Sequence, residues 1–446
     1  MSKLATGINS FGEIIKTNKS ALLSKIKSTG IYLLVPLINF GFSIFTSPVF
    51  AKYLSAEEFG YFGYYSTLSG FILVFYSLSF QTYYMSIYFR ESPAERKATQ
   101  ASLVLFVLLW NVVFFPVSYG FLYLYFKYSQ SIIPFFPFAL LTLGGTVLGV
   151  SKGFVQINFR LEQKPIRFLI WVSGFRVLTI VISLYFVIVP KLGLMGRMAG
   201  IFIVEVIFLV ISLYLTFKNQ RINIDRNVIK KSIRKILPLL PASLLFIPIF
   251  SYDNIALERM HQPKEMGLYN IGKNIAQYLY TALYPFFQAF EPDIYKNAIA
   301  RNTRGLVRIG LLIGGITVCS LVCFWIFSPY LISYLTAGKY TEALRFSNIL
   351  AVTYCLIIFY SVFDAIVMAW QETKAHLVIN AIVSTCSIIM FTLGAHFFSQ
   401  MGVAFASSLN WTLMILIQIF FVWKKIKNYK TLQSVSSSSI KKMVHE

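Results

Sequence analysis

The stretch GLYNIGKNIAQYLYTALYPFFQAF, residues Gly267–Phe290, decides the fold of this chain. It is apolar and long enough to cross a bilayer, which takes about 20 residues, yet it carries Lys273 near its start. Polar side chains recur along it every three to four residues, namely Asn270, Lys273, Asn274, Gln277, Thr281, Tyr284 and Gln288. This period places them on one face of a helix. Because a charge inside a membrane faces protein or water, the stretch predicts a membrane helix beside a polar cavity.

Similar apolar runs fill most of the 446 residues, of which 57% are hydrophobic and 13% are charged. Each run is long enough to span about 30 Å of hydrocarbon, and helices satisfy the backbone there. The sequence therefore predicts an all-α, polytopic membrane protein rather than a soluble domain or a β-barrel. About twelve spans are expected, over residues 30–52, 60–88, 100–126, 132–157, 167–189, 194–217, 237–257, 267–290, 306–330, 345–369, 375–398 and 402–423.

The net charge of +23 follows the membrane topology. If the N-terminus is cytoplasmic, about 30 of the 40 Lys and Arg residues fall in the tails and inner loops, Lys152 among them. Only Arg176 and Lys273 are assigned to spans. This distribution predicts an even number of crossings with both termini cytoplasmic, and no nucleic-acid partner.

Neither terminus predicts a soluble domain. The first apolar run exceeds the core of a signal peptide and is expected to stay as a span. Residues 1–29 carry apolar side chains on one helical face and lysines elsewhere, so they form either an amphipathic surface helix or a basic tail. The cysteines lie inside spans and are expected to be packing residues, so no metal site is predicted.

The chain also repeats itself. Glu58-Phe-Gly-Tyr-Phe opens the second span and Glu265-Met-Gly-Leu-Tyr opens the eighth, 207 residues later. Six spans per half make a parallel repeat, with substrate expected between the halves. The predicted organisation is a cytoplasmic segment 1–29, a six-helix bundle 30–218, a basic cytoplasmic linker 219–236, a six-helix bundle 237–425 and a cytoplasmic tail 426–446.

The order of these motifs resembles a known family. The Glu-x-Gly-x-aromatic motif of each half, the Leu237-Pro…Pro241 entry leading to Asp253, and Gly267-Leu-Tyr-Asn are similar to those of Wzx-type polysaccharide flippases in the multidrug/oligosaccharidyl-lipid/polysaccharide (MOP) exporter superfamily. The resemblance covers about residues 30–425. It implies two six-helix bundles arranged as a V around a central cavity.

The same resemblance implies a function. Such a protein would reside in the bacterial inner membrane and use alternating access to move undecaprenyl-pyrophosphate-linked oligosaccharide, for O-antigen or a related surface polysaccharide, to the outer leaflet. It would not be an enzyme, and a polysaccharide polymerase and other assembly proteins would be its partners.

An anionic pyrophosphate calls for cations in the cavity. Lys273 is the first candidate and Arg176 the second. Each also has a possible structural partner, because Asp253 lies near the end of the span before Lys273 and Glu205 lies in the span after Arg176. The sequence leaves open whether each cation binds the substrate or forms a structural ion pair. It also leaves open whether Asp364 is a proton site, a cation site or a buried protonated acid.

Further candidates for contact with the substrate lie on three spans. They are Asn270, Asn274, Gln277, Thr281, Tyr284 and Gln288 on the eighth, Asn39 and Ser43 on the first, and Gln81 and Arg90 on the second. The alternative role of such amides and hydroxyls is hydrogen bonding between helices.

Competing functions predict other features. A multidrug/cation antiporter is expected to hold a carboxylate in the first span, and residues 30–52 have none. A peptidoglycan-precursor flippase usually has more spans. A membrane glycosyltransferase or polymerase needs a large loop or a carboxylate/metal site. No cofactor is predicted, and no phosphate-binding Gly-x-x-x-x-Gly-Lys motif indicates ATP, so coupling to membrane potential or to an H⁺ or Na⁺ gradient is expected.

Overall fold

The computed structural model describes residues 34–444 except 219–223, 238–239 and 371–372. Every regular secondary-structure element in that part is a helix. The predicted surface segment 1–29 lies outside the described residues. The helices are a first helix Leu34–Tyr53, α2 Ala56–Ser77, α3 Phe80–Ile87, α4 Pro93–Ser129, α5 Phe138–Leu161, α6 Pro165–Ile188, α7 Gly193–Phe217, α8 Arg226–Ile236, α9 Leu240–Glu258, α10 Pro263–Ile299, α11 Thr303–Leu335, the short η1 Thr341–Ala343, α12 Leu344–Ala369 and α13 Thr373–Val444.

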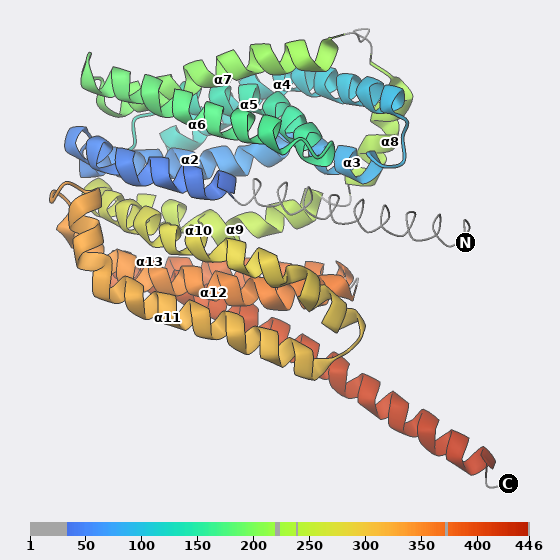
Figure 1. Cartoon of the computed structure of the whole chain (residues 1–446). Coiled ribbons are helices and arrows are strands. Elements are labelled where there is room, and N and C mark those ends of the chain that lie inside the picture. Colours follow the sequence, from blue (N-terminus) through green and yellow to red (C-terminus); the bar gives the residue numbers. More distant parts are fainter. Residues whose placement is uncertain (1–33, 219–223, 238–239, 371–372, 445–446) are drawn as a thin grey trace, which may run out of the picture.

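The helices form two layers, which lie one above the other in Figure 1. We call the first helix through α7 the N-half and α9 to α13 the C-half. The short α8 joins them and packs on α3 and α4. α13 breaks at Phe398 and Ser399, whose backbone is not helical, and so supplies two spans. Every predicted span therefore has its helix, and the predicted all-α architecture is confirmed for the described residues.

The helices between the layers differ from the rest in composition. Of the described helices, eight are long and apolar enough to cross a membrane, and α2, α9 and α10 are not among them. α2 packs on α10 and on α9 across the boundary between the halves. Polar side chains of these helices meet one another there and not lipid, as Asn254 of α9 does with Thr67 of α2.

The repeat is visible in the helix boundaries. α2 begins at residue 56 and α10 at 263, while α5 begins at 138 and α12 at 344. Both pairs reproduce the sequence offset of 207 residues to within one position. The paired motifs therefore occupy equivalent places in the two halves.

The glycines of these motifs meet where α2 crosses α10. A Cβ atom on Gly267 would lie 1.6 Å from the carbonyl oxygen of Ala56, and one on Gly60 would lie 3.0 Å from the backbone nitrogen of Gly267. Only glycine allows two helix backbones to approach so closely. The repeated Glu-x-Gly motif thus builds the contact between the halves.

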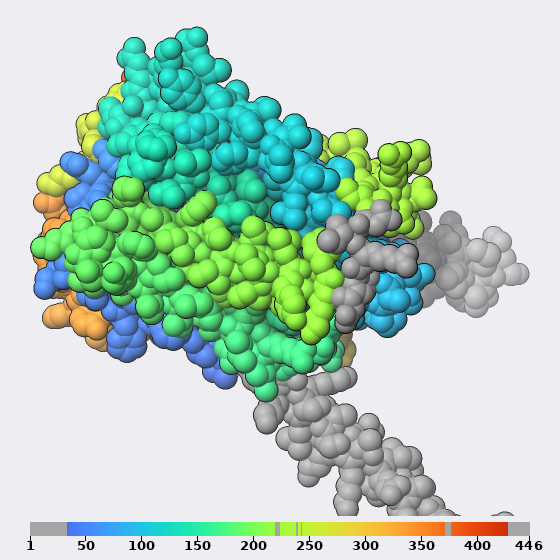
Figure 2. Space-filling view, turned by 90° about the horizontal axis from the view of Figure 1, so that it is seen from above, coloured from blue at the N-terminus to red at the C-terminus, as the bar shows by residue number. Residues whose placement is uncertain are grey.

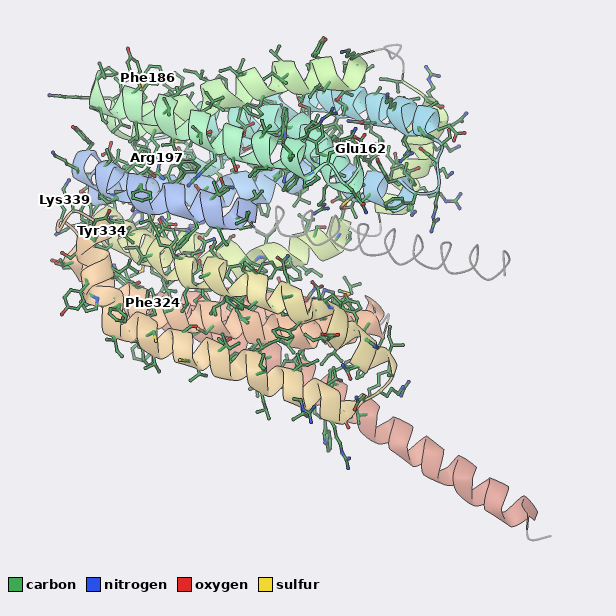
Figure 3. All side chains as sticks on the ribbon, viewed as in Figure 1. Glu162, Phe186, Arg197, Phe324, Tyr334 and Lys339 are labelled. Carbon is green, nitrogen blue, oxygen red and sulfur yellow. The ribbon has the colours of Figure 1, made fainter. Side chains whose placement is uncertain are left out.

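Further contacts close the same end of the molecule. Lys339 Nζ and Tyr340 Oη both donate to the carbonyl oxygen of Leu54, at 3.0 and 2.5 Å. Lys339 lies at the left end of the molecule in Figure 3, where the C-half loop reaches the end of the first helix. The Glu58 carboxylate accepts from the backbone N–H of Ser55, which is the N-cap of α2, and from the backbone N–H of Leu194 at 2.6 Å. This end is therefore held by backbone as well as side-chain contacts.

The outer surface is apolar, as a lipid environment requires. Figure 2 shows a face of the molecule that includes α4, α6 and α7. These helices carry the exposed side chains of Val112, Phe121, Ile170, Val210 and Tyr214. An aqueous surface would not leave so many large apolar side chains uncovered. The protein is a multi-pass membrane protein.

Replacing the crossing glycine tests this interface. We expect Gly267→Ala to destabilise the protein by about 1–3 kcal/mol, because the new methyl group overlaps the backbone of α2. Thermal unfolding in detergent measures the effect. Gly310→Ala in α11 is the matched control, because its Cβ would meet nothing within 4 Å. Equal unfolding temperatures for the two variants would contradict the close crossing.

Candidate functional site

A cavity of about 470 Å³ lies between the halves, and we call it the interface cavity. The first helix, α2, α6 and α7 line it from the N-half, and α10 lines it from the C-half. On the first helix the lining runs from Pro36 to Phe50, about 21 Å of helix. The polar side chains of its wall are Asn39, Ser43, Thr46, Ser47, Arg176, Thr179, Ser183, Arg197, Asn274, Gln277, Tyr278 and Thr281.

Two arginines give this cavity its charge. Arg176 on α6 is exposed to the cavity and donates to Ser43 Oγ at 2.9 Å. Arg197 on α7 is half-buried, and its guanidinium lies 3.7 Å from the ring centroid of Phe62 and 4.7 Å from that of Phe50. Figure 3 shows Arg197 beside the first helix, within the N-half. Among the described residues, no carboxylate lines the cavity and neither arginine forms an ion pair.

This arrangement favours an anion. Arg176 and Arg197 line the same cavity, and a bound anion would offset the repulsion between their like charges. Guanidinium groups bind phosphate through two parallel hydrogen bonds, which suits a diphosphate. The Arg197 Nη1 atom is buried without a hydrogen-bond partner among the described residues, so this guanidinium has unused hydrogen-bonding capacity.

A second cavity, of about 510 Å³, lies inside the C-half between α9, α10 and α12, and we call it the C-half cavity. Its walls are mainly aromatic and its charged lining residues are Lys273, Glu291 and Asp364. Gln277 lines both cavities and so stands between them.

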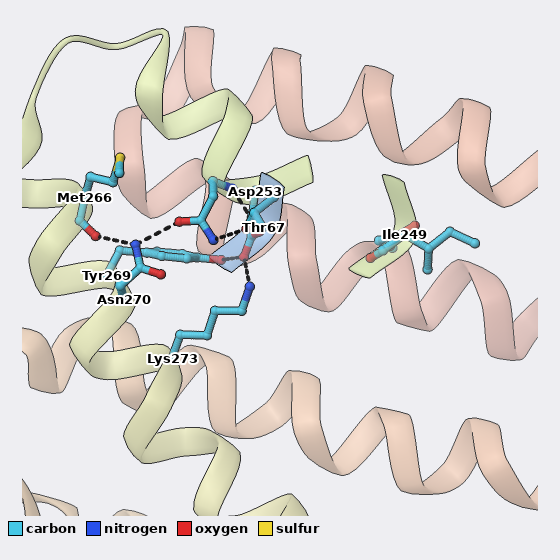
Figure 4. Close-up of polar contacts among 9 residues, drawn as sticks. Thr67, Ile249, Asp253, Met266, Tyr269, Asn270 and Lys273 are labelled. Atoms are coloured by element: carbon cyan, nitrogen blue, oxygen red, sulfur yellow. Dashed lines mark hydrogen bonds and ion pairs between the residues drawn. The ribbon is translucent and has the colours of Figure 1, made fainter. Parts of the chain in front are cut away.

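Lys273 is neutralised by its neighbour. Lys273 Nζ lies 2.5 Å from Asp253 Oδ2, and the side chains are 22% and 3% exposed (Figure 4). The same oxygen accepts from Tyr269 Oη at 2.8 Å, while Asp253 Oδ1 accepts from the backbone N–H of Asn254. The predicted Lys273–Asp253 pair is therefore confirmed. That Lys273 also binds the substrate anion stays a prediction, and its charge is already offset.

Asn270 belongs to the contact between the halves. Its Nδ2 donates to Asn254 Oδ1 at 2.8 Å, and Asn254 Nδ2 donates to Thr67 Oγ1 on α2 at 3.0 Å (Figure 4). The chain of bonds joins α10, α9 and α2. This amide therefore stabilises the helix crossing and does not line either cavity.

For the buried charges, the structure excludes one possible ion pair and corrects the placement of one lysine. Glu205 forms its ion pair with Lys152, at 2.6 Å, and not with Arg176. Lys152 lies within α5 and not in an inner loop. The physical reason is that α5 packs directly on α7, so the Lys152 ammonium reaches Glu205, while the face of α6 that carries Arg176 turns to the interface cavity.

The other candidates divide between the two cavities and the surface. Asn39, Ser43, Asn274, Gln277 and Thr281 line the interface cavity. Tyr284 and Asp364 line the C-half cavity. Gln81 donates to the carbonyl oxygen of Val150 at 3.0 Å, which makes it a contact within the N-half. Arg90 and Gln288 are exposed and line neither cavity.

Arg197 and Tyr278 are the cavity residues that the sequence did not single out. Arg197 stands four residues after the start of α7, where it was counted with loop charges. A cation followed by a long apolar run was the available signal. Tyr278 contacts Phe40 of the first helix edge-to-face, with ring centroids 5.1 Å apart.

Solved structures with this architecture come from the MOP superfamily. Lipid II flippase MurJ, in an inward closed conformation, matches with a TM-score of 0.70 at 15% identity, over 87% of this chain and 86% of that one. An inward-facing multidrug resistance MATE family transporter matches with a TM-score of 0.69 at 13% identity, over 90% and 99%. A MOP superfamily transporter from Pyrococcus furiosus matches with a TM-score of 0.57 at 12% identity, over 91% and 96%. The fold is therefore that of MOP transporters and flippases.

The sequence defines the family more closely. The model of the family described as "Polysaccharide biosynthesis protein" matches residues 26–298. The chain belongs to this family. No curated protein matches the chain by sequence.

The Lys273–Asp253 pair generates a prediction about stability. We expect Lys273→Met to destabilise the protein by about 3–5 kcal/mol, because it leaves the buried carboxylate of Asp253 without a counter-charge. Adding Asp253→Asn should restore most of the loss. Thermal unfolding of the two single variants and the double variant measures this coupling. Additive losses in the double variant would show that the pair is not the structural unit.

Proposed function

We propose that the protein is a flippase for anionic lipid-linked oligosaccharides, which it carries from the cytoplasmic to the outer leaflet of the inner membrane. The observation that carries this proposal is the pair Arg176 and Arg197, which line a cavity between the two halves and have no counter-ion among the described residues. Membership of the polysaccharide biosynthesis family and the likeness to a lipid II flippase support it.

The substrate would divide its chemistry over the cavity. The pyrophosphate would lie between Arg176 and Arg197, where it is the missing counter-ion. Hydroxyl groups of the first sugars would meet Asn39, Asn274 and Gln277. The polyprenyl tail, which needs no polar partner, would stay in the lipid. An undecaprenyl carrier and an O-antigen or related repeat unit fit this arrangement.

The direction of opening follows from the charges. With both termini cytoplasmic, the end that carries Leu54, Gly60 and Gly267 faces outward. That end is closed by the glycine crossing and by Lys339, so the interface cavity would load from the cytoplasm. Transport would then require these contacts to separate while the opposite end closes.

Two related functions make other demands. A multidrug/cation antiporter would present a carboxylate to a cationic drug, whereas the described lining of the interface cavity holds two arginines and no carboxylate. A peptidoglycan-precursor flippase would use the same anion chemistry, and it differs from our proposal in the head group carried and in its usual number of spans.

Substitution of the two arginines tests the proposal. We expect Arg176→Gln and Arg197→Gln each to weaken substrate binding by about tenfold or more, because each removes a charge-assisted hydrogen bond to phosphate. A fluorescent undecaprenyl-pyrophosphate oligosaccharide in proteoliposomes reports both binding and movement between leaflets.

Arg308→Gln is the matched control for these variants. Arg308 is an exposed arginine of α11 that lines neither cavity. The control should move substrate at the native rate. Native rates in Arg176→Gln and Arg197→Gln as well would remove these residues from the site and with them the proposed function.

Energy coupling gives a separate prediction. An inside-negative potential favours outward movement of an anion by about 2.3 kcal/mol per charge per 100 mV. We therefore expect faster export in proteoliposomes when valinomycin sets such a potential than when the potential is zero. Export that responds neither to potential nor to H⁺ or Na⁺ gradients would contradict electrophoretic or ion-coupled drive.

A further inference from the structure

We propose that the C-half cavity is a sugar subsite and that it selects neutral or amine-bearing sugars over acidic ones. The inference rests on the proposed function, because it takes the pyrophosphate to lie at the arginines of the interface cavity. The two cavities share Gln277, so one head group can reach from the first into the second.

The walls of the C-half cavity suit sugar rings. Tyr280 and Tyr284 stack with ring centroids 5.1 Å apart, and Tyr354 lies against Tyr280 at 6.1 Å. Tyr295 and Tyr360 complete the wall. Tyrosine presents an apolar face with a polar tip, and a pyranose presents an apolar C–H face with hydroxyl edges. The two surfaces are chemically complementary.

Asp364 offers an acceptor to this space. Its Oδ1 accepts from Tyr360 Oη at 3.2 Å and from Gln418 Nε2 at 3.4 Å, and His376 Nδ1 lies 3.2 Å from the same oxygen. These three contacts converge on Oδ1. The side chain is 25% exposed, so Oδ2 can accept a hydroxyl or an ammonium group.

The charge balance of the two cavities is opposite. Glu291 also lines the C-half cavity and forms no ion pair with any described residue. The one lysine of the lining, Lys273, is offset by Asp253. Carboxylates therefore outnumber free cations here, whereas Arg176 and Arg197 make the interface cavity cationic.

This contrast in charge predicts which cavity binds each part of the head group. A diphosphate is attracted to the interface cavity and repelled by the C-half cavity. A uronic acid in the C-half cavity would meet Asp364 and Glu291, and like charges at such range in a partly buried site weaken binding by about tenfold or more. A neutral sugar has no such penalty, and an amino sugar gains an ion pair.

Binding of matched probes to the full chain in nanodiscs tests the inference. The probes are farnesyl pyrophosphate without sugar, and farnesyl-pyrophosphate disaccharides that end in N-acetylglucosamine, glucuronic acid or glucosamine. We expect the glucuronic acid probe to bind about tenfold more weakly than the neutral one. In Asp364→Asn/Glu291→Gln this difference should fall below about twofold, while the probe without sugar should bind as before.

A partial variant guards against loss of folding. Glu291 is less enclosed by hydrogen bonds than Asp364, so Glu291→Gln alone should fold and should recover part of the affinity for the acidic probe. Equal affinities for the acidic and neutral probes in the native protein, or a difference unchanged in both variants, would overturn the subsite. Failure of the probe without sugar to bind, or its indifference to Arg176→Gln and Arg197→Gln, would instead overturn the proposed function.

Discussion

The close crossing of α2 and α10 is the constraint on which the rest of the structure depends. Gly60 and Gly267 occupy equivalent places in the two halves, and they bring the two backbones into contact. Because the halves touch there, the Asn270–Asn254–Thr67 hydrogen bonds can form across the boundary. Away from the crossing the space between the helices holds the interface cavity. A site at the boundary of two halves is what alternating access requires.

The ion pair between Asp253 and Lys273 also determines how charge is distributed between the two cavities. A buried ion pair gains little net stability unless its remaining polar atoms are satisfied, and Tyr269 and the Asn254 backbone satisfy those of Asp253. The pair offsets the charge of Lys273 beside the C-half cavity. Among the arginines and lysines that line the two cavities, Arg176 and Arg197 are therefore the ones without an ion pair to a described residue, and both line the interface cavity.

Hydropathy and the repeat predicted the twelve spans and the pairing of the halves, because these properties depend on local composition. Adjacent antiparallel helices also predicted the Lys273–Asp253 pair. The polar stripe of α10 was predicted as one cavity face, but it divides between two. Lys273 and Asn274 are neighbours in sequence and so point about 100° apart around the helix, one to the C-half cavity and one to the interface cavity.

Pairing among buried charges could not be predicted in the same way. Periodicity gives the face of a helix but not which neighbour that face meets. Glu205 could be expected to meet Arg176 on the adjacent helix, yet the packing of α5 on α7 brings Lys152 to it. Arg197 was overlooked because its place near the start of α7 made it look like a loop charge. Long-range packing decides these contacts.

Photo-cross-linking of the bound substrate tests the central claim most directly. An undecaprenyl-pyrophosphate oligosaccharide with a diazirine on the isoprene unit next to the pyrophosphate would be bound to the protein in membranes and irradiated. The account predicts adducts on the walls of the interface cavity, around Ser43, Arg176 and Tyr278. Adducts confined to the C-half cavity, or to the lipid-facing surfaces of α4 and α7, would contradict it.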